Sequence, residues 1–231
     1  MISCQSEFNL VDKGYSRTLL LIPGWAADPR IFAALELKYN YLFPQQICAK
    51  SFTQSLSDAL EKNKLKKISI LGYSLGGFLA LEFAKKHLDE VDELFLVSIR
   101  KSYSLQELQG VRERIIKNKA AFLNRFYGDW FNEEDEGQSW FRKNLLKEYI
   151  SEMRLKDLLE GLDYLASVCV EPGDLSLVKS VAVFHGTKDK IAPFKEVETL
   201  VAGSLSARFV PLEQAGHMPF FNREFHEKIA D

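Results

Sequence analysis

Ser74 is the residue whose surroundings best suit it to nucleophilic chemistry. It is the central residue of Gly72-Tyr73-Ser74-Leu75-Gly76, which follows the apolar run Ile68–Leu71 and precedes the helix-like segment Phe78–His87. Between a strand and a helix, this pattern gives a tight turn that exposes the serine hydroxyl at a helix N-terminus, where negative charge is stabilised. We therefore predict that Ser74 is a nucleophile. The alternative is an ordinary glycine-rich turn.

A serine hydroxyl needs a base to remove its proton, and the chain has four histidines. His217 lies in the segment Gln214–Pro219, just past the apolar run Arg208–Leu212. If that run is a parallel strand, His217 occupies a loop at the carboxyl edge of the sheet, where α/β proteins bind their ligands. We predict that His217 is the base; the alternative is a structural or surface histidine. The other three are His87, His185 and His226.

A carboxylate is needed to fix the imidazole tautomer and to stabilise its protonated form. Asp189 suits this role, because it follows the apolar run Val181–Phe184 within the loop HGTKDKIAP. The alternative is an aspartate that only closes a local turn. The chain order Ser74, Asp189, His217 is that of one of the known triad arrangements.

Acyl transfer also requires N–H groups that bind the oxyanion. One candidate is the backbone N–H of Leu75, directly after Ser74. The second is expected in the loop after an early strand, and Pro23-Gly24-Trp25 follows the apolar run Thr18–Ile22. We predict that the N–H of Trp25 is this second donor. The alternative is a Pro-Gly turn that carries a core tryptophan.

The elements that must position these residues alternate along the chain. Short, continuously apolar runs are typical of strands buried on both faces of a parallel sheet. Five runs fit this description, although Pro211 puts the last near a sheet edge or strand end: Thr18–Ile22, Ile68–Leu71, Leu94–Val97, Val181–Phe184 and Arg208–Leu212. Helix-period segments lie between them, so the sequence predicts an α/β fold with a mostly parallel sheet flanked by helices.

The alternation stops between about residues 102 and 166. This stretch has no proline and no strand-like run, and its apolar residues recur at helical spacing up to Phe122 and again from Trp140 to Leu165. The acidic cluster Glu133–Glu136 lies between the two parts. We expect roughly 60 helical residues to form a lid within a single domain spanning residues 1–231, which suits the ~150 residues of a typical domain plus an insertion.

Composition excludes several classes of protein. The chain has 231 residues, 46% hydrophobic and 27% charged, as in soluble globular proteins. Thirty basic against 32 acidic residues give a formal charge of −2, which argues against a nucleic-acid partner. No run approaches the roughly 20 apolar residues of a membrane span, and no signal peptide is visible. Three widely spaced cysteines form neither a disulfide framework nor a zinc site. We expect a cytoplasmic monomer.

Four motifs in order, LLLIPGW, GYSLGG, HGTKDKIAP and QAGHMPF, make the chain resemble the α/β-hydrolase superfamily. Within it, the sequence is most similar to the pimeloyl-[acyl-carrier protein] methyl ester esterases of biotin synthesis. The resemblance implies a triad of Ser74, His217 and Asp189, no metal and no organic cofactor. It also implies that Trp25, Phe122 and Phe126 contact the acyl chain. Two departures are Pro23, where the family usually has histidine, and a short segment Lys38–Lys50.

The expected lid is rich in basic residues, and acidic carrier proteins dock on such surfaces. We single out Arg125, Arg142 and Arg154 as carrier-protein contacts. The alternative is solvated helix faces, with Lys143 and Lys147 near Glu148 and Glu152 as helical partners. The lid aromatics could equally line a pocket or pack against the core.

The sequence therefore predicts a serine carboxylesterase that cleaves the methyl ester of a carrier-bound acyl chain through an acyl-enzyme. One alternative is a hydrolase of free small esters, thioesters or lactones. Another is a non-catalytic protein that kept the fold and uses its pocket as a receptor.

Overall fold

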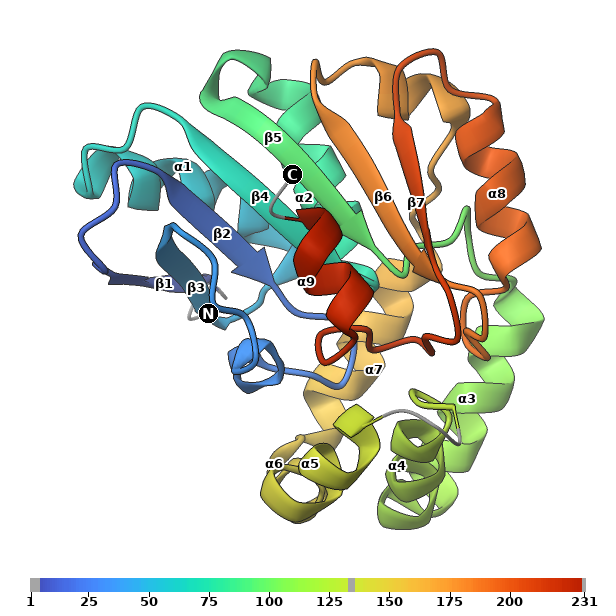
Figure 1. The fold of residues 1–231 in the computed structure, drawn as a ribbon. Helices are drawn as coiled ribbons and strands as arrows, with labels where there is room; N and C mark the ends of the chain where they lie inside the picture. Colours follow the sequence, from blue (N-terminus) through green and yellow to red (C-terminus); the bar gives the residue numbers. More distant parts are fainter. Residues whose placement is uncertain (1–4, 133–135, 230–231) are drawn as a thin grey trace.

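The computed structural model describes residues 5–132 and 136–229, and a single sheet runs through this part of the chain. The strand order is β1-β3-β2-β4-β5-β6-β7, and every neighbouring pair is parallel apart from β1 and β3 (Figure 1). The strands are β1 (Glu7–Val11), β2 (Thr18–Ile22), β3 (Asn40–Gln46), β4 (Ile68–Tyr73), β5 (Val91–Val97), β6 (Val181–Gly186) and β7 (Arg208–Leu212).

The five strands expected from apolar runs are all present, and the predicted fold class is confirmed. Every residue of β2, β4 and β6 is buried, as expected for strands covered on both faces. β7 is an edge strand, which is where Pro211 can be tolerated because its missing N–H costs no bond on the open side.

Two strands, β1 and β3, were not expected from the sequence. β1 alternates between exposed and partly buried residues, so it has no continuous apolar run. β3 contains Pro44 and ends in two exposed glutamines, yet it lies inside the sheet between β1 and β2. The β1 register shifts between Glu7 and Phe8, close to the Phe8–Pro44 pair. Pairing with neighbours therefore overrides local composition in this part of the sheet.

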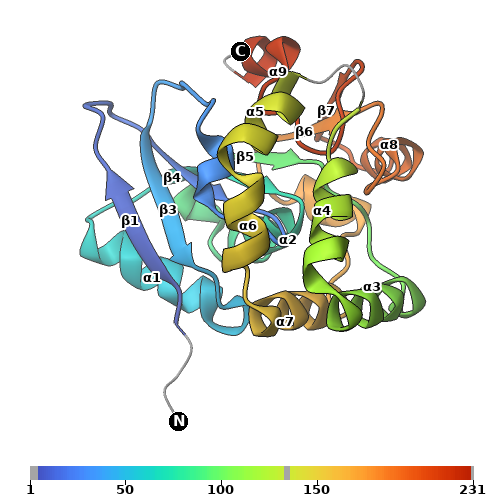
Figure 2. The ribbon, with the colours of Figure 1, turned by 90° about the horizontal axis from the view of Figure 1, so that it is seen from below.

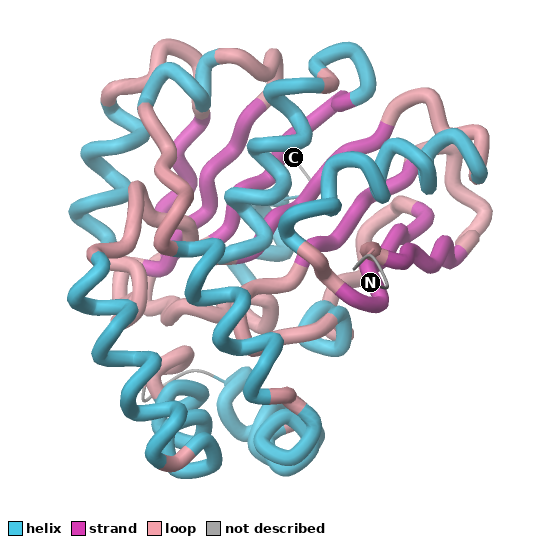
Figure 3. Tube along the Cα trace, turned by 180° about the vertical axis from the view of Figure 1, so that it is seen from behind, coloured by secondary structure: helices cyan, strands magenta, loops and turns pink. Residues whose placement is uncertain are grey.

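Helices cover both faces of the sheet. Figure 1 shows α9 (Arg223–Ile229) in front of the strands and α1 (Phe52–Lys62) and α2 (Leu75–Lys86) behind them, and Figure 3 shows this second face from the other side. α8 (Phe194–Ala202) contacts β6 and β7. Fully buried aromatic side chains fill the layers between helices and sheet, among them Phe52, Phe83, Phe184 and Phe225.

Between β5 and β6, the described residues of the expected insertion 102–166 form five α-helices. They gather at one end of the sheet (Figures 1 and 2). They are α3 (Leu105–Lys117), α4 (Lys119–Gly128), α5 (Glu136–Asn144), α6 (Leu146–Glu152) and α7 (Leu155–Leu165). Ser104 and Asn118 begin α3 and α4 with side-chain caps. The helical pattern expected from Trp140 to Leu165 is divided among α5, α6 and α7, and residues 133–135 of the acidic cluster lie outside the described residues.

Gly186, the last residue of β6, lets two loops approach each other. A Cβ atom there would lie 2.3 Å from the carbonyl oxygens of both Ala215 and Gly216. Those two residues directly precede His217, and Asp189 follows Gly186 by three residues. The absence of a side chain at this strand end therefore brings the Asp189 and His217 loops together.

We expect Gly186→Ala to lower the free energy of unfolding by about 1–3 kcal/mol, because backbone oxygens cannot move aside as a flexible side chain would. Denaturant unfolding measures this change. Gly173→Ala is the matched control, since a Cβ atom on Gly173 meets nothing within 4 Å. Equal stability of the two variants would contradict the close approach of the loops.

Candidate active site

Ser74 occupies the tight turn between β4 and α2. Its backbone is in an unusual conformation for a side-chain-bearing residue, with φ 52° and ψ −116°. The turn requires glycine on both sides: a Cβ atom on Gly72 would lie 2.5 Å from the Gly76 carbonyl oxygen, and one on Gly76 would lie 2.3 Å from that of Ile22. The Ser74 hydroxyl is thus held above the end of the sheet at the start of α2.

The structure brings the three predicted side chains into one hydrogen-bonded chain. His217 Nε2 lies 3.1 Å from Ser74 Oγ, and His217 Nδ1 lies 2.7 Å from Asp189 Oδ2. The three residues come from the turn after β4, the loop after β6 and the loop after β7. With Nδ1–H donating to the carboxylate, Nε2 is the free base that faces the serine hydroxyl.

The two oxygens of the Asp189 carboxylate have different partners, so the role in a local turn and the role in the triad coexist. Oδ1 accepts hydrogen bonds from the N–H groups of Ile191 and Ala192, each at 2.8 Å, while Oδ2 faces His217. Burial alone would raise the pKa of this carboxyl. The interactions with His217, and then those with His185 and the Ala192 N–H, outweigh burial and hold the pKa below its usual range. Asp189 is therefore ionised at neutral pH.

His185 is a second buried histidine beside this carboxylate. Its Nε2 donates to the Ala192 carbonyl at 2.8 Å and lies 3.5 Å from Asp189 Oδ2. Burial lowers the pKa of His185, so the ring is neutral at neutral pH. A neutral His185 leaves the negative charge of Asp189 to stabilise a positive charge on His217.

The segments that carry the two predicted oxyanion donors both lie next to Ser74. Leu75 is the first residue of α2, and Gly24 approaches so closely that a Cβ atom on it would lie 3.1 Å from Ser74 Cβ. Trp25 follows Gly24, and its indole is buried, so the core-tryptophan alternative describes its side chain correctly. Phe122 and Phe126 of α4 contact that indole edge-on, with ring centroids 6.2 and 5.0 Å away.

Two tyrosines that were not predicted as site residues also belong to this site. The hydroxyl of Tyr103 interacts with Ser74, and the Arg100 guanidinium lies 4.5 Å from the centroid of its ring. Burial raises the pKa of Tyr103 to about 12, although Arg100 and Ser74 act in the opposite direction. Tyr73 packs its ring against His217 at 5.3 Å. Tyr103 could have been suspected, because it follows β5, the parallel neighbour of β4.

The three arginines singled out as carrier-protein contacts are exposed on different parts of the insertion. Arg125 lies on α4 and Arg142 on α5, whereas Arg154 precedes α7 and pairs with Asp157 at 2.6 Å. Glu148 and Glu152, to which the alternative gave lysine partners on the helix, both bind Arg30, which lies outside the insertion. The ion pairs of these two glutamates are therefore tertiary contacts between α6 and the core.

Other kinds of site are not seen in the described residues. No group of three or more His, Cys, Asp and Glu side chains there has a metal-site arrangement. No helix within residues 5–132 and 136–229 is long and apolar enough to cross a bilayer.

Known proteins share this architecture. A family model described as alpha/beta hydrolase fold matches residues 39–224. The chain belongs to this hydrolase family. An AB hydrolase superfamily protein from Bacillus subtilis, YisY, is 26% identical over 94% of this chain and 90% of its own length. A pimeloyl-[acyl-carrier protein] methyl ester esterase from Aromatoleum aromaticum is 22% identical over 88% of this chain and 92% of its own. An esterase from Exiguobacterium antarcticum superposes with a TM-score of 0.80 at 19% identity, covering 97% of this chain and 94% of that one.

The neutral state of His185 in this hydrolase predicts a pH effect on stability. Its folded pKa lies below the usual 6.5, so the folded state binds fewer protons than the unfolded state and stability is lost as the pH falls below 6.5. One such group contributes a slope of up to about 1.4 kcal/mol per pH unit. We expect His185→Gln to remove this contribution to the slope of the unfolding free energy against pH, measured by denaturant unfolding between pH 5 and 7. An unchanged slope would mean that His185 does not titrate on unfolding.

Proposed function

We propose that this protein is a serine carboxylesterase in which Ser74, His217 and Asp189 form the catalytic triad. The observation that carries the proposal is the unbroken hydrogen-bonded chain, 3.1 Å from Ser74 Oγ to His217 Nε2 and 2.7 Å from His217 Nδ1 to Asp189 Oδ2. The strained backbone of Ser74 supports it, because such strain is typical of functional turns.

In the proposed mechanism, His217 Nε2 takes the proton of Ser74 while Oγ attacks the ester carbonyl. The N–H groups of Trp25 and Leu75 bind the resulting oxyanion. His217 returns the proton to the departing alcohol, which leaves an acyl-enzyme on Ser74. A water molecule, deprotonated by His217, then attacks the acyl carbonyl carbon. The bond to Ser74 Oγ breaks, His217 returns the proton to Oγ, and the acid is released. Ionised Asp189 stabilises the His217 imidazolium in both halves.

The substrate we propose is the methyl ester of an acyl chain bound to an acyl-carrier protein. The match to a relative named for that activity supports this choice. Trp25, Phe122 and Phe126 offer an apolar contact for an acyl chain. The exposed guanidiniums of Arg125 and Arg142 suit an acidic carrier.

The first test is covalent labelling of the serine by a fluorophosphonate. We expect the wild-type protein to be labelled at Ser74 and to hydrolyse a nitrophenyl ester, and Ser74→Ala to do neither, because the attacking oxygen is gone. Asp189→Asn should retain slow labelling while kcat falls by roughly 10⁴-fold, since the imidazole then loses its orienting charge. An unlabelled wild-type protein would instead indicate a binding protein that kept the fold.

The second test separates carrier-bound from free esters, which an esterase of the same mechanism could also take. Arg125→Glu with Arg142→Glu should lower kcat/KM on the carrier-bound methyl ester by roughly tenfold or more, because charge complementarity governs encounter. Added salt should act in the same direction by screening these charges. Hydrolysis of a short nitrophenyl ester should change little in both cases. Equal effects on both substrates, or none, would favour the small-ester alternative.

A further inference from the structure

The helical insertion hydrogen-bonds to one particular loop of the core, Gly24–Asp28, at three points. The Trp25 indole N–H donates to the Leu158 carbonyl at 2.9 Å, and the Tyr127 hydroxyl donates to the Ala26 carbonyl at 2.9 Å. The Tyr149 hydroxyl accepts from the Asp28 N–H at 3.2 Å and lies 2.9 Å from the Asp28 carboxylate. The three partners come from α7, α4 and α6, so separate helices hold consecutive parts of the same loop.

The backbone of this loop is in an unfavourable conformation, which its contacts have to stabilise. Ala26 has a φ of 57°, in the left-handed region that costs energy for a residue with a side chain. The carbonyl of this same residue receives the Tyr127 hydroxyl. Tyr127 is only 1% exposed, and burial together with the charge of Asp28 raises its pKa, so the hydroxyl remains a donor.

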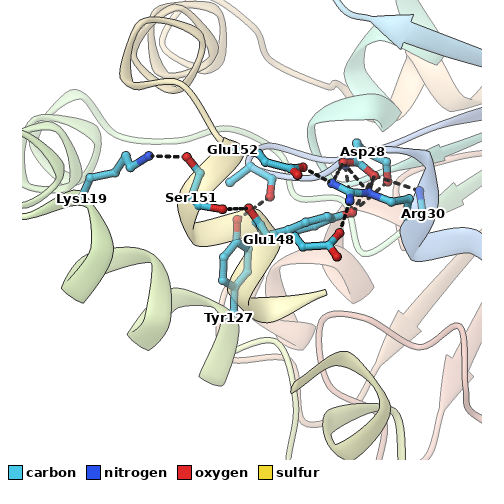
Figure 4. A network of polar contacts seen from close by, with 9 residues as sticks. Asp28, Arg30, Lys119, Tyr127, Glu148, Ser151 and Glu152 are labelled. Atoms are coloured by element: carbon cyan, nitrogen blue, oxygen red, sulfur yellow. Dashed lines mark hydrogen bonds and ion pairs between the residues drawn. The ribbon is translucent and has the colours of Figure 1, made fainter. Parts of the chain in front are cut away.

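An ionic cluster closes the outer side of the contact (Figure 4). Arg30 binds the Asp28 carboxylate and reaches Glu148 and Glu152 on α6. Its guanidinium also lies 5.0 Å from the centroid of the Tyr149 ring. Because Arg30 bridges Asp28 and α6, the end of the loop cannot shift without breaking several charged contacts.

Gly161 of α7 lies directly against the Trp25 indole. A Cβ atom on Gly161 would lie 2.5 Å from Trp25 Cδ1 and 3.0 Å from Trp25 Nε1. The missing side chain is therefore what allows the indole to lie against the helix and reach the Leu158 carbonyl. The proposed oxyanion donor is the backbone N–H of the same residue, so we expect a displaced indole to move the donor.

We propose that Gly161, Tyr127 and Tyr149 are positioning residues for the oxyanion hole, which is complete only while the insertion is docked on the loop Gly24–Asp28. This inference rests on the proposed function, in which the Trp25 N–H binds the oxyanion. None of the three touches the reacting atoms. They act through the backbone conformation of Trp25 and its neighbours.

The test compares two helical glycines of the insertion. Gly161→Ala should lower kcat on a nitrophenyl ester by roughly 10- to 100-fold, because a donor displaced by a fraction of a bond length stabilises the transition state less. KM should stay within about twofold, since a ground-state carbonyl depends less on these donors than the transition state does. Inhibition by a trifluoromethyl ketone, whose serine adduct carries the oxyanion, should weaken by the same factor as kcat.

Gly110→Ala is the matched control. Gly110 lies within α3, and a Cβ atom there meets nothing within 4 Å. Both changes replace a helical glycine by a better helix former, so neither should weaken its helix. We expect Gly110→Ala to keep wild-type kcat and inhibitor affinity.

A second pair of variants removes one hydroxyl group each. Tyr127→Phe should lower kcat and inhibitor affinity several-fold with little change in KM. Tyr41→Phe removes another buried hydroxyl, which lies outside the loop Gly24–Asp28. This hydroxyl donates to the Leu35 carbonyl at 3.0 Å and accepts from the Leu37 N–H at 2.8 Å. It should affect stability without affecting kcat.

The outcomes separate this inference from the proposed function. A wild-type protein that neither hydrolyses the ester nor reacts with the fluorophosphonate would overturn the proposed function and this inference with it. An active wild type whose Gly161→Ala and Tyr127→Phe variants keep kcat and inhibitor affinity would overturn the inference alone. So would equal losses in Gly110→Ala and Tyr41→Phe, because the effect would then be one of general stability.

Discussion

The arrangement of this molecule depends on one buried hydrogen bond, between the His217 ring and the ionised Asp189 carboxylate. A carboxylate removed from water is costly unless it is paired and hydrogen-bonded. Asp189 meets this condition through two backbone N–H groups on one oxygen and the imidazole on the other. The partners come from loops after two neighbouring strands, so the parallel order of β6 and β7 is a precondition for the charge to exist there at all.

Much of this could be predicted from the sequence, because the fold and the triad residues leave local signals. Buried parallel strands are short apolar runs, and Ser74, Asp189 and His217 each follow such a run. β1 and β3 leave no such signal, because β1 alternates between exposed and partly buried residues and β3 contains Pro44 and ends in two exposed glutamines. The catalytic assignment itself stays a prediction, whereas the spatial meeting of the three side chains is a property of the structure.

Residues that act across the boundary between core and insertion could not be predicted. Tyr127, Tyr149 and Gly161 look like ordinary helix residues, and their partners lie more than a hundred residues earlier in the chain. The same holds for Glu148 and Glu152, whose helical spacing indicated lysine partners but whose charges bind Arg30. Spacing along a helix describes only the partners that the helix itself supplies. Contacts made by docking depend on the relative placement of two bodies.

The three bonds between the insertion and the loop Gly24–Asp28 also bear on how such proteins diversify. Hydrolases that differ in substrate are easily pictured as one core that carries interchangeable helical insertions. Here the insertion and the loop are joined by hydrogen bonds at Trp25, Ala26 and Asp28. A foreign insertion grafted onto this core would need its own acceptor for the indole and its own hydroxyls for the loop. The two segments therefore have to change together if these hydrogen bonds are to be kept.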